Sequence, residues 1–324
     1  MGKNLPDILI IAGPTGVGKS SAAVKAAEEL NGEIISADSR QIYRGLIIGT
    51  AAPSPELQHK IPHHLLNVLD PREVWSAGAF ADEAAVIIED ILVRKLLPIV
   101  VGGSGFYIKA LTGGLFREPE TDPAERQKIR ADLQKRLEKE GIQALHSDLA
   151  ICDPEWAQQV SDTDTQRILR GMEVFALYGK PLTLLQTENQ APPQVHANWC
   201  TLLLERERKD LYARLNRRVD KMLDEGWLGE AKSLMMARVP ADAPGLTGLG
   251  YDLLFEHLSG RVSLDEAVDG ICREHRNYAK RQLSWFRNIA AHRIHLDRDD
   301  GSHETASRIV DAWRKHVDGT LEVS

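Results

Sequence analysis

The sequence predicts an α/β fold in which helices flank a parallel sheet, interrupted by an all-helical insertion. A continuous apolar run at residues 8–12 precedes a glycine-rich loop, and a helical pattern follows over residues 21–30. Further short apolar runs at 33–37 and 98–101 are separated by a helical pattern, as in the strand–helix–strand units of parallel sheets. Residues 119–195 show helical patterns alone.

Residues 13–20 fit the P-loop pattern G-x-x-x-x-G-K-[ST]. Glycines let the backbone fold tightly, so that its N–H groups point at phosphate oxygens, and the following helix adds its positive N-terminal end. The lysine can reach the terminal phosphate and the serine hydroxyl can hold Mg²⁺. We therefore expect a P-loop NTPase-like core whose polyphosphate ligands are Gly13, Thr15, Gly16, Val17, Gly18, Lys19 and Ser20.

The motif does not say which polyphosphate is bound, although nucleotides such as ATP are typical ligands of P-loops. The alternative is a plain glycine-rich turn between a strand and a helix. The correct strand and helix on either side of the motif disfavour that alternative.

Composition narrows the class of protein. The 324 residues carry a net charge of −7, which argues against a non-specific polyanion binder while leaving local basic surfaces possible. Cys152, Cys200 and Cys272 are far apart, with neither metal-ligand spacing nor a disulfide framework. No apolar stretch approaches the roughly 20 residues of a membrane span. We expect a cytoplasmic protein that does not enter membranes.

The second predicted strand, residues 33–37, ends at Asp38. Ligands of open α/β sheets bind at the carboxyl ends of the strands, so this carboxylate is a candidate for metal or proton chemistry. The alternative, that Asp38 only caps a following helix, is equally compatible with the residues alone. A third strand is predicted at 63–68, where His63 and His64 would point to opposite faces and make packing or polar contacts rather than bind a metal.

The fourth predicted strand, residues 98–101, runs into glycines and Ser104. P-loop NTPases usually place an aspartate at this point, to hold Mg²⁺ through water. Its absence argues against ordinary ATP hydrolysis. The glycines suggest that a ligand approaches the backbone closely. Before this strand, residues 53–62 are expected to form a loop and residues 77–95 a helix.

Three segments follow from these patterns: the first part of the core at 1–118, the helical insertion at 119–195, and the return to the core at 196–324. Within the insertion, helices are predicted at 121–141, 145–159 and 165–178. The core resumes with a fifth strand at 198–204 and helices at 208–225, 230–237, 251–258 and 264–289, with a loop at 240–250.

The last of these helices carries a basic face. Arg273, Arg276, Lys280 and Arg287 share one side, and Tyr278, Trp285 and Phe286 are interleaved with them. On an acidic chain this cluster is the best candidate for a nucleic-acid surface. A solvated helix face with an aromatic core stripe is the alternative.

Six separated stretches closely resemble the bacterial tRNA dimethylallyltransferases, and they run in order over about 280 residues. They lie at 13–20, 38–43, 102–107, 164–170, 218–222 and 278–287. The specific parts are Asp38-Ser39-Arg40-Gln41 and the run from Tyr278 to Gln282. The loop at 246–252 departs from the family's usual pattern.

The resemblance implies transfer of a dimethylallyl group from dimethylallyl diphosphate to the exocyclic N6 of adenine 37 in tRNA. It implies that the P-loop and a Mg²⁺ ion on Ser20 stabilise the leaving diphosphate, that Arg218 clamps it, and that Asp38 is the general base. Catalytic roles are implied for Asp38, Ser104 and Arg218, with Gln41 reading the adenine edge. Contacts with tRNA are expected from Asp38, Ser39, Arg40, Gln41, Ser104, Gln166, Arg167, Arg170, Arg276, Lys280 and Arg281.

Three alternatives remain at this point. A nucleoside or metabolite kinase fits the P-loop and would use ATP. An adenylate isopentenyltransferase would modify free AMP, but it needs neither the insertion nor the basic helix. A non-catalytic RNA-binding module leaves Asp38 and Arg218 without a purpose. We expect the tRNA enzyme, acting as a monomer.

Overall fold

The structure, a computed structural model, describes residues 5–116, 118–189, 192–298 and 300–322. The chain forms two compact units, one made of Met1–Thr112 and Gln194–Ser324, the other of Gly113–Pro193. The second unit covers most of the segment that the sequence assigns to the insertion. Among the described helices, none combines the length and the apolar character needed to cross a bilayer.

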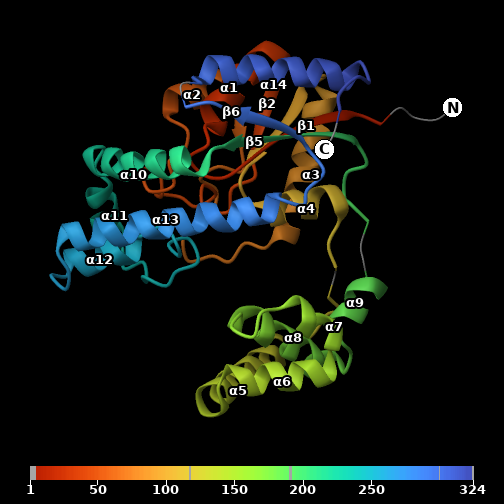
Figure 1. The fold of residues 1–324 in the computed structure, drawn as a ribbon, viewed down its shortest axis with the longest axis vertical. Coiled ribbons are helices and arrows are strands. Elements are labelled where there is room, and N and C mark those ends of the chain that lie inside the picture. The colour runs from red at the N-terminus through yellow and green to blue at the C-terminus, as the bar shows by residue number, and fades with distance from the viewer. Residues whose placement is uncertain (1–4, 117, 190–191, 299, 323–324) are drawn as a thin grey trace. The chain divides into compact units, whose positions relative to one another are not determined.

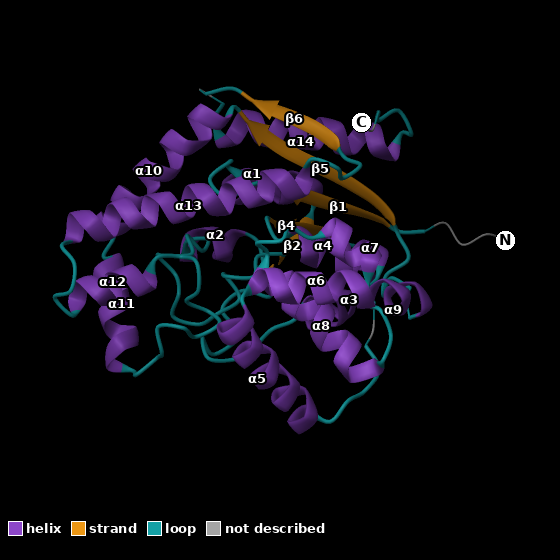
Figure 2. Ribbon diagram, turned by 60° about the horizontal axis from the view of Figure 1, so that its bottom comes forward, coloured by secondary structure: helices purple, strands orange, loops and turns teal. Residues whose placement is uncertain are grey.

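The first unit is built on a parallel sheet of six described strands in the order β3-β2-β4-β1-β5-β6 (Figures 1 and 2). Because β4 lies between β1 and β2, the carboxyl ends of these three strands are neighbours. The P-loop, Asp38 and the glycine turn before Ser104 therefore meet at one edge of the sheet. The strands are β1 (Asp7–Ala12), β2 (Gly32–Ser36), β3 (His63–His64), β4 (Leu97–Gly102), β5 (Asn198–Arg206) and β6 (His292–Leu296).

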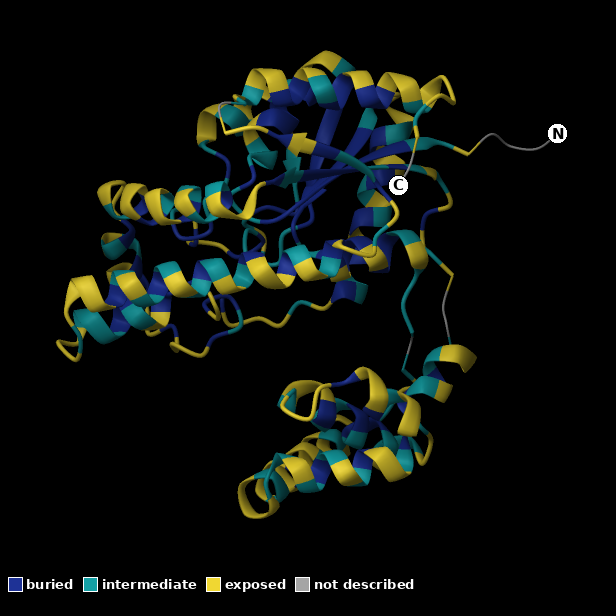
Figure 3. Ribbon diagram, viewed as in Figure 1, coloured by how far each residue is buried: buried dark blue, intermediate teal, exposed yellow. Residues whose placement is uncertain are grey.

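Helices cover both faces of this sheet, and the strands between them are buried (Figure 3). One face packs against α1 and α14, and α3 packs on the other (Figure 1). The helices of this unit are α1 (Lys19–Leu30), α2 (Pro55–Lys60), α3 (Ala77–Val93), α4 (Gly105–Gly113), α10 (Arg208–Asp224), α11 (Trp227–Met236), α12 (Tyr251–Leu258), α13 (Leu264–Phe286) and α14 (Ser302–Val317).

The second unit is helical in its described part and has its own apolar centre, in which Leu145, Leu149 and Ile168 are fully buried. Buried Glu173 accepts ion pairs from Arg126, at 2.8 Å, and from two further arginines. The helices are α5 (Pro123–Glu140), α6 (Ile142–Cys152), α7 (Pro154–Gln159), α8 (Thr165–Tyr178) and α9 (Leu182–Glu188).

Several elements differ from the sequence-based expectations. The third strand ends at His64 instead of residue 68, because Leu65 and Asn67 adopt φ of 56° and 55°, which a strand cannot accommodate. The predicted loop at 53–62 contains α2, and the helix predicted at 145–159 is two helices separated at Asp153. The sequence analysis did not predict β6, α4, α9 or α14.

Candidate functional site

The P-loop connects β1, whose apolar residues are fully buried, to α1. Gly16 and Gly18 have φ of 80° and 116°, a region that favours glycine, and this lets the loop turn sharply. The Lys19 ammonium lies back over the loop, donating from Nζ to the carbonyls of Gly13 at 2.8 Å and Pro14 at 2.9 Å. The predicted phosphate ligands are thus part of one continuous turn.

The pKa of Lys19 is shifted by its surroundings. Burial lowers its pKa to about 8, with the Arg218 guanidinium adding to the shift and the Asp38 carboxylate opposing it. The same carboxylate opposes the lowering of the Arg218 pKa by burial. One acid and two cations that are far apart in the sequence therefore interact at a single site.

Arg218, on α10, reaches the P-loop from the side of the sheet's carboxyl edge. Its guanidinium donates to Thr15 Oγ1 at 3.0 Å and to the Thr50 carbonyl at 3.3 Å. Within the described residues, its buried Nε has no hydrogen-bond partner. A buried N–H donor without a partner, next to the P-loop, is the arrangement expected for an arginine that binds an anion.

The rest of α10 contributes more positive charge than the sequence analysis recognised. Arg214, Arg217 and Lys221 line the same pocket as Arg218, since positions three, four and seven apart share a helix face. Arg214 Nε also donates to the Gly16 carbonyl at 3.1 Å. The spacing of these basic residues was visible in the sequence, but only the fold shows that their face is turned to the P-loop.

Asp38 lies two residues after the end of β2, is half-buried and lines the pocket. No helix begins here: the Asp38 carboxylate accepts from the backbone N–H of Arg40 at 2.8 Å and of Gln41 at 3.4 Å, closing a turn. The helix-cap alternative is therefore wrong, because the next described helix starts only at Pro55. The second carboxylate oxygen is not used in this turn.

Ser104 lies beside this turn, since its Oγ accepts the backbone N–H of Ser39 at 2.9 Å. Tyr278, on α13, also reaches the group: burial and the Asp38 charge raise its pKa to about 12, while hydrogen bonding with Ser39 and Ser104 opposes the shift. Tyr278 is therefore a neutral hydrogen-bonding group near Asp38 at neutral pH. The sequence analysis placed Tyr278 in a family-specific run and among the aromatic residues of the basic helix, but did not assign it to the site.

Lys19, Ser20, Asp38 and Arg218 border a pocket of about 470 Å³. Apolar side chains, among them Ala23, Ile34, Leu57 and Val101, form another part of its wall. A pocket of this kind fits a small anionic ligand that carries an apolar group.

Gln41 lines this pocket, but its amide is engaged within the protein. Its Nε2 donates to the carbonyls of Thr50, at 3.2 Å, and Ala51, at 3.1 Å. The loop that carries these carbonyls is itself held by Glu230, whose carboxylate accepts three successive backbone N–H groups starting at Ile47. Reading an adenine edge would require Gln41 to exchange these partners.

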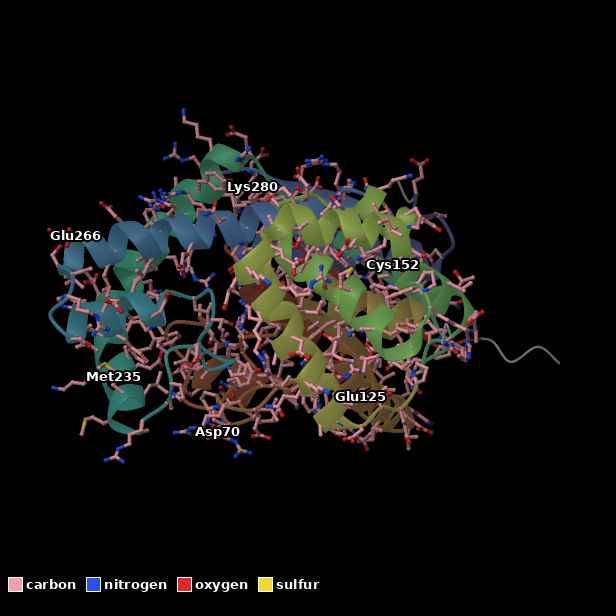
Figure 4. All side chains as sticks on the ribbon, turned by 90° about the horizontal axis from the view of Figure 1, so that it is seen from below. Asp70, Glu125, Cys152, Met235, Glu266 and Lys280 are labelled. Atoms are coloured by element: carbon pink, nitrogen blue, oxygen red, sulfur yellow. The ribbon has the colours of Figure 1, made fainter. Side chains whose placement is uncertain are left out.

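The remaining predicted tRNA contacts of the first unit are divided between surface and interior. Lys280 and Arg281 are exposed on α13, and Lys280 is marked in Figure 4. Arg276 on the same helix donates to Asn216 Oδ1 at 2.8 Å. Arg40 is half-buried and donates to the Pro244 carbonyl at 2.8 Å and to Thr247 Oγ1 at 3.0 Å. The bond to Thr247 ties the unusual 246–252 region to the site.

The predicted contacts of the second unit lie together on α8. Gln166, Arg167 and Arg170 all line a groove of about 620 Å³ between α5 and α8. Gln166 and Arg167 are exposed, but Arg170 forms ion pairs with Glu118 and Glu173. Arg167 is thus the freer cation of the two, although its Nε lies 3.6 Å from Asp164 Oδ2.

Fold and site together define the class of protein. It is an α/β protein with a P-loop-like turn and a cation-rich pocket. Ser104 follows the strand after which a nucleotide hydrolase would place a metal-binding aspartate, and Asp38 follows the neighbouring strand β2. The family model described as IPP transferase matches residues 41–289, and the chain belongs to that family.

Curated relatives and solved structures agree with this assignment. The chain is 43% identical to tRNA dimethylallyltransferases from Salinibacter ruber, over 86% of this chain and 85% of the relative, and from Geobacter sulfurreducens, over 88% and 90%. It resembles the crystal structure of a full-length tRNA isopentenylpyrophosphate transferase from Bacillus halodurans, with 35% identity, TM-score 0.68 and 97% of each chain covered. A eukaryotic dimethylallyltransferase acting on tRNA matches with TM-score 0.77 and 25% identity, over 98% of this chain and 81% of the other.

Proposed function

We propose that this chain transfers the dimethylallyl group of dimethylallyl diphosphate to N6 of adenine 37 in tRNA, beside the anticodon, and releases diphosphate. The observation that carries the proposal is that Lys19, Arg218 and Asp38 line one pocket whose wall also contains apolar side chains. A leaving diphosphate matches the cations, an allyl chain matches the apolar wall, and an attacking amine needs a base. The family and the names of its members support tRNA as the acceptor.

The reaction forms a bond between the adenine N6 nitrogen and the first carbon of the allyl group, and breaks the bond from that carbon to the diphosphate oxygen. Lys19, Arg218 and the N–H groups of the P-loop stabilise the negative charge that develops on the leaving oxygen. The Asp38 carboxylate accepts the N6 proton. Ser104, held beside Asp38 through Ser39, orients the amine with its hydroxyl group.

The site also fits Mg²⁺. Ser20, at the start of α1, and Asp38 line the same pocket, and their hydroxyl and carboxylate oxygens are ligand types that Mg²⁺ accepts together with substrate phosphates and water. When bound there, the ion would neutralise diphosphate charge. Within the described residues no three His, Cys, Asp or Glu side chains form a metal cluster, so this ion would depend on the substrate for its other ligands.

The acceptor base must leave the anticodon loop before it can reach Asp38, because N6 of a stacked adenine is not accessible to a pocket. The exposed cations Lys280 and Arg281 on α13 and Arg167 on α8 are the groups that we expect to hold the tRNA backbone. Both substrates are served by residues of one chain, which supports a monomer as the active form. A tRNA substrate supports the cytoplasmic location expected from the cysteine pattern.

The test is transfer by the purified chain to unmodified tRNA, read by mass analysis of the nucleosides. We expect dimethylallyl-adenosine with dimethylallyl diphosphate, and no tRNA-dependent reaction with ATP. Asp38→Asn should keep both substrate affinities and lose roughly 10²- to 10⁴-fold in single-turnover rate, the usual scale of general-base loss. A near-normal rate in this variant would remove Asp38 from the mechanism, and an absence of product with wild type would refute the function.

A further inference from the structure

Gln282 on α13 has no role in the mechanism above, yet it is only 6% exposed and is hydrogen-bonded to two loops of the site. Its Oε1 accepts the backbone N–H of Thr15 at 2.8 Å, and its Nε2 donates to the Gly103 carbonyl at 2.9 Å. The amide orientation is unambiguous, because a backbone N–H can only donate and a carbonyl can only accept. One side chain therefore joins the P-loop to the turn that follows β4.

The fit around this amide is tight. A Cβ atom at Gly103 would lie 2.3 Å from Gln282 Nε2, so only glycine permits the approach. The backbone N–H of Thr15 donates to Gln282, whereas the N–H groups of P-loops ordinarily point at phosphate oxygens. Thr15 is thus positioned by the protein before any ligand binds.

The two hydrogen-bond partners of Gln282 are themselves connected to the two groups of residues that the proposed reaction uses. On one side, Thr15 Oγ1 accepts from Arg218, the proposed diphosphate clamp. On the other side, Gly103 precedes Ser104, which binds the backbone of Ser39 next to Asp38. One hydrogen-bonded connection between the leaving-group side and the acceptor side therefore passes through this amide. A second runs from Arg218 through the Thr50 carbonyl and Gln41 to Asp38, and does not include the P-loop or Ser104.

We propose that Gln282 is a positioning residue that fixes the separation between the diphosphate cradle and the Asp38–Ser104 acceptor side; this rests on the proposed transfer reaction. Transfer requires the allyl carbon and the amine nitrogen in line and in near contact, and an error of about 1 Å costs on the order of 10²-fold in rate. Substrate binding does not require this alignment, since each half of the site binds its own substrate. The loss should therefore fall on kcat rather than on KM.

The first experiment uses Gln282→Met, which keeps the side-chain length and removes both hydrogen bonds. We expect kcat to fall on the order of 10²-fold while KM for dimethylallyl diphosphate and Kd for tRNA change less than about threefold. The control is Leu283→Met, the next residue on α13, which alters a side chain packed against the same core but removes neither hydrogen bond of Gln282, and should retain wild-type kcat. A kcat within threefold of wild type for Gln282→Met, or an equal fall with Leu283→Met, would overturn the proposal.

The second experiment remains decisive if Gln282→Met folds poorly. In Gln282→Glu, a protonated carboxyl can still accept from Thr15 and donate to the Gly103 carbonyl, whereas the carboxylate can only accept and would face that carbonyl. The ratio of variant to wild-type kcat should therefore rise as pH falls from 8.5 to 6, by on the order of tenfold. A constant ratio would contradict the positioning role. Since every measurement is relative to an active wild type, an inactive wild type would instead refute the proposed function itself.

Discussion

At the scale of the residue, the net charge of the site depends on pH through the protonation of Lys19. Its ammonium is buried next to Arg218, so its pKa of about 8 in the free protein lies below the usual value for lysine. A bound diphosphate favours the charged form, because opposite charges then lie close together. Lys19 therefore takes up a proton when an anion binds at pH values near or above 8.

The affinity for dimethylallyl diphosphate should therefore fall as the pH rises above 8. Below pH 8 Lys19 is protonated both in the free protein and in the complex with dimethylallyl diphosphate, so the affinity for this substrate should be constant there. Above pH 8 the free protein has lost the proton, so we expect an affinity about tenfold lower at pH 9 than at pH 7. Calorimetry in buffers of different ionisation enthalpy should show net proton uptake at pH 8.5.

Lys19→Arg is the matched control for this titration, since it keeps a positive charge that does not titrate in this range. Its affinity should be lower overall and unchanged between pH 7 and 9. If wild type shows no proton uptake and the same affinity at both pH values, Lys19 does not contact the diphosphate.

At the scale of the element, α10 supplies the pocket with a row of cations. Arg218 binds within the protein, while Arg217 and Lys221 are exposed where they line the pocket. Exposed charges around a pocket attract a substrate of opposite charge over several ångströms, and salt screens this attraction. Arg217 and Lys221 should therefore affect the capture of the diphosphate and not the chemistry.

The double substitution Arg217→Gln with Lys221→Gln tests this. At low salt we expect kcat/KM for dimethylallyl diphosphate to fall about tenfold, with kcat unchanged, and we expect the difference to shrink toward zero at about 0.5 M salt. Arg208→Gln with Lys209→Gln removes the same charge from the same helix away from the pocket and serves as the comparison. Equal effects of the two double variants would mean that only net charge matters.

The elements also show what sequence patterns can predict here. The central strands were predictable because residues 8–12 and 98–101 are buried on both faces and so are continuously apolar. The edge strand β6 escaped prediction because His292, Arg293 and His295 interrupt its apolar pattern. At the site, motifs predicted Lys19 and Asp38, whereas buried Gln282 has the residue type of a surface position. Only the packing of α13 reveals its partners.

At the scale of the whole molecule, the two units divide the proposed labour. The residues that we propose to bind diphosphate and to accept the proton all belong to the first unit, Met1–Thr112 and Gln194–Ser324. The second unit has its own buried centre and a groove bordered by Arg130, Arg167 and Arg170. It should therefore be needed for holding tRNA and not for holding the small substrate.

Within that groove, the ion pairs separate the two arginines that sequence reasoning treated alike. Arg170 is half-buried between Glu118 and Glu173, and its removal would leave those carboxylates with one cation fewer. Arg167 is exposed and is the better probe of a phosphate contact. Arg167→Ala should weaken tRNA binding and lower the slope of log affinity against log salt by about one unit, as expected for one lost phosphate contact.

The measurement is tRNA affinity at several salt concentrations, with dimethylallyl diphosphate affinity measured separately in the absence of tRNA and expected to be unchanged. Lys128→Ala removes one exposed charge from α5 of the same unit outside the groove, and should leave the salt slope as in wild type. Adding Arg170→Ala to Arg167→Ala lowers the slope further only if Arg170 leaves its carboxylate partners to bind phosphate. Parallel salt lines for wild type and Arg167→Ala would show that this groove does not touch the tRNA backbone, and α8 would then serve only the internal packing of its unit.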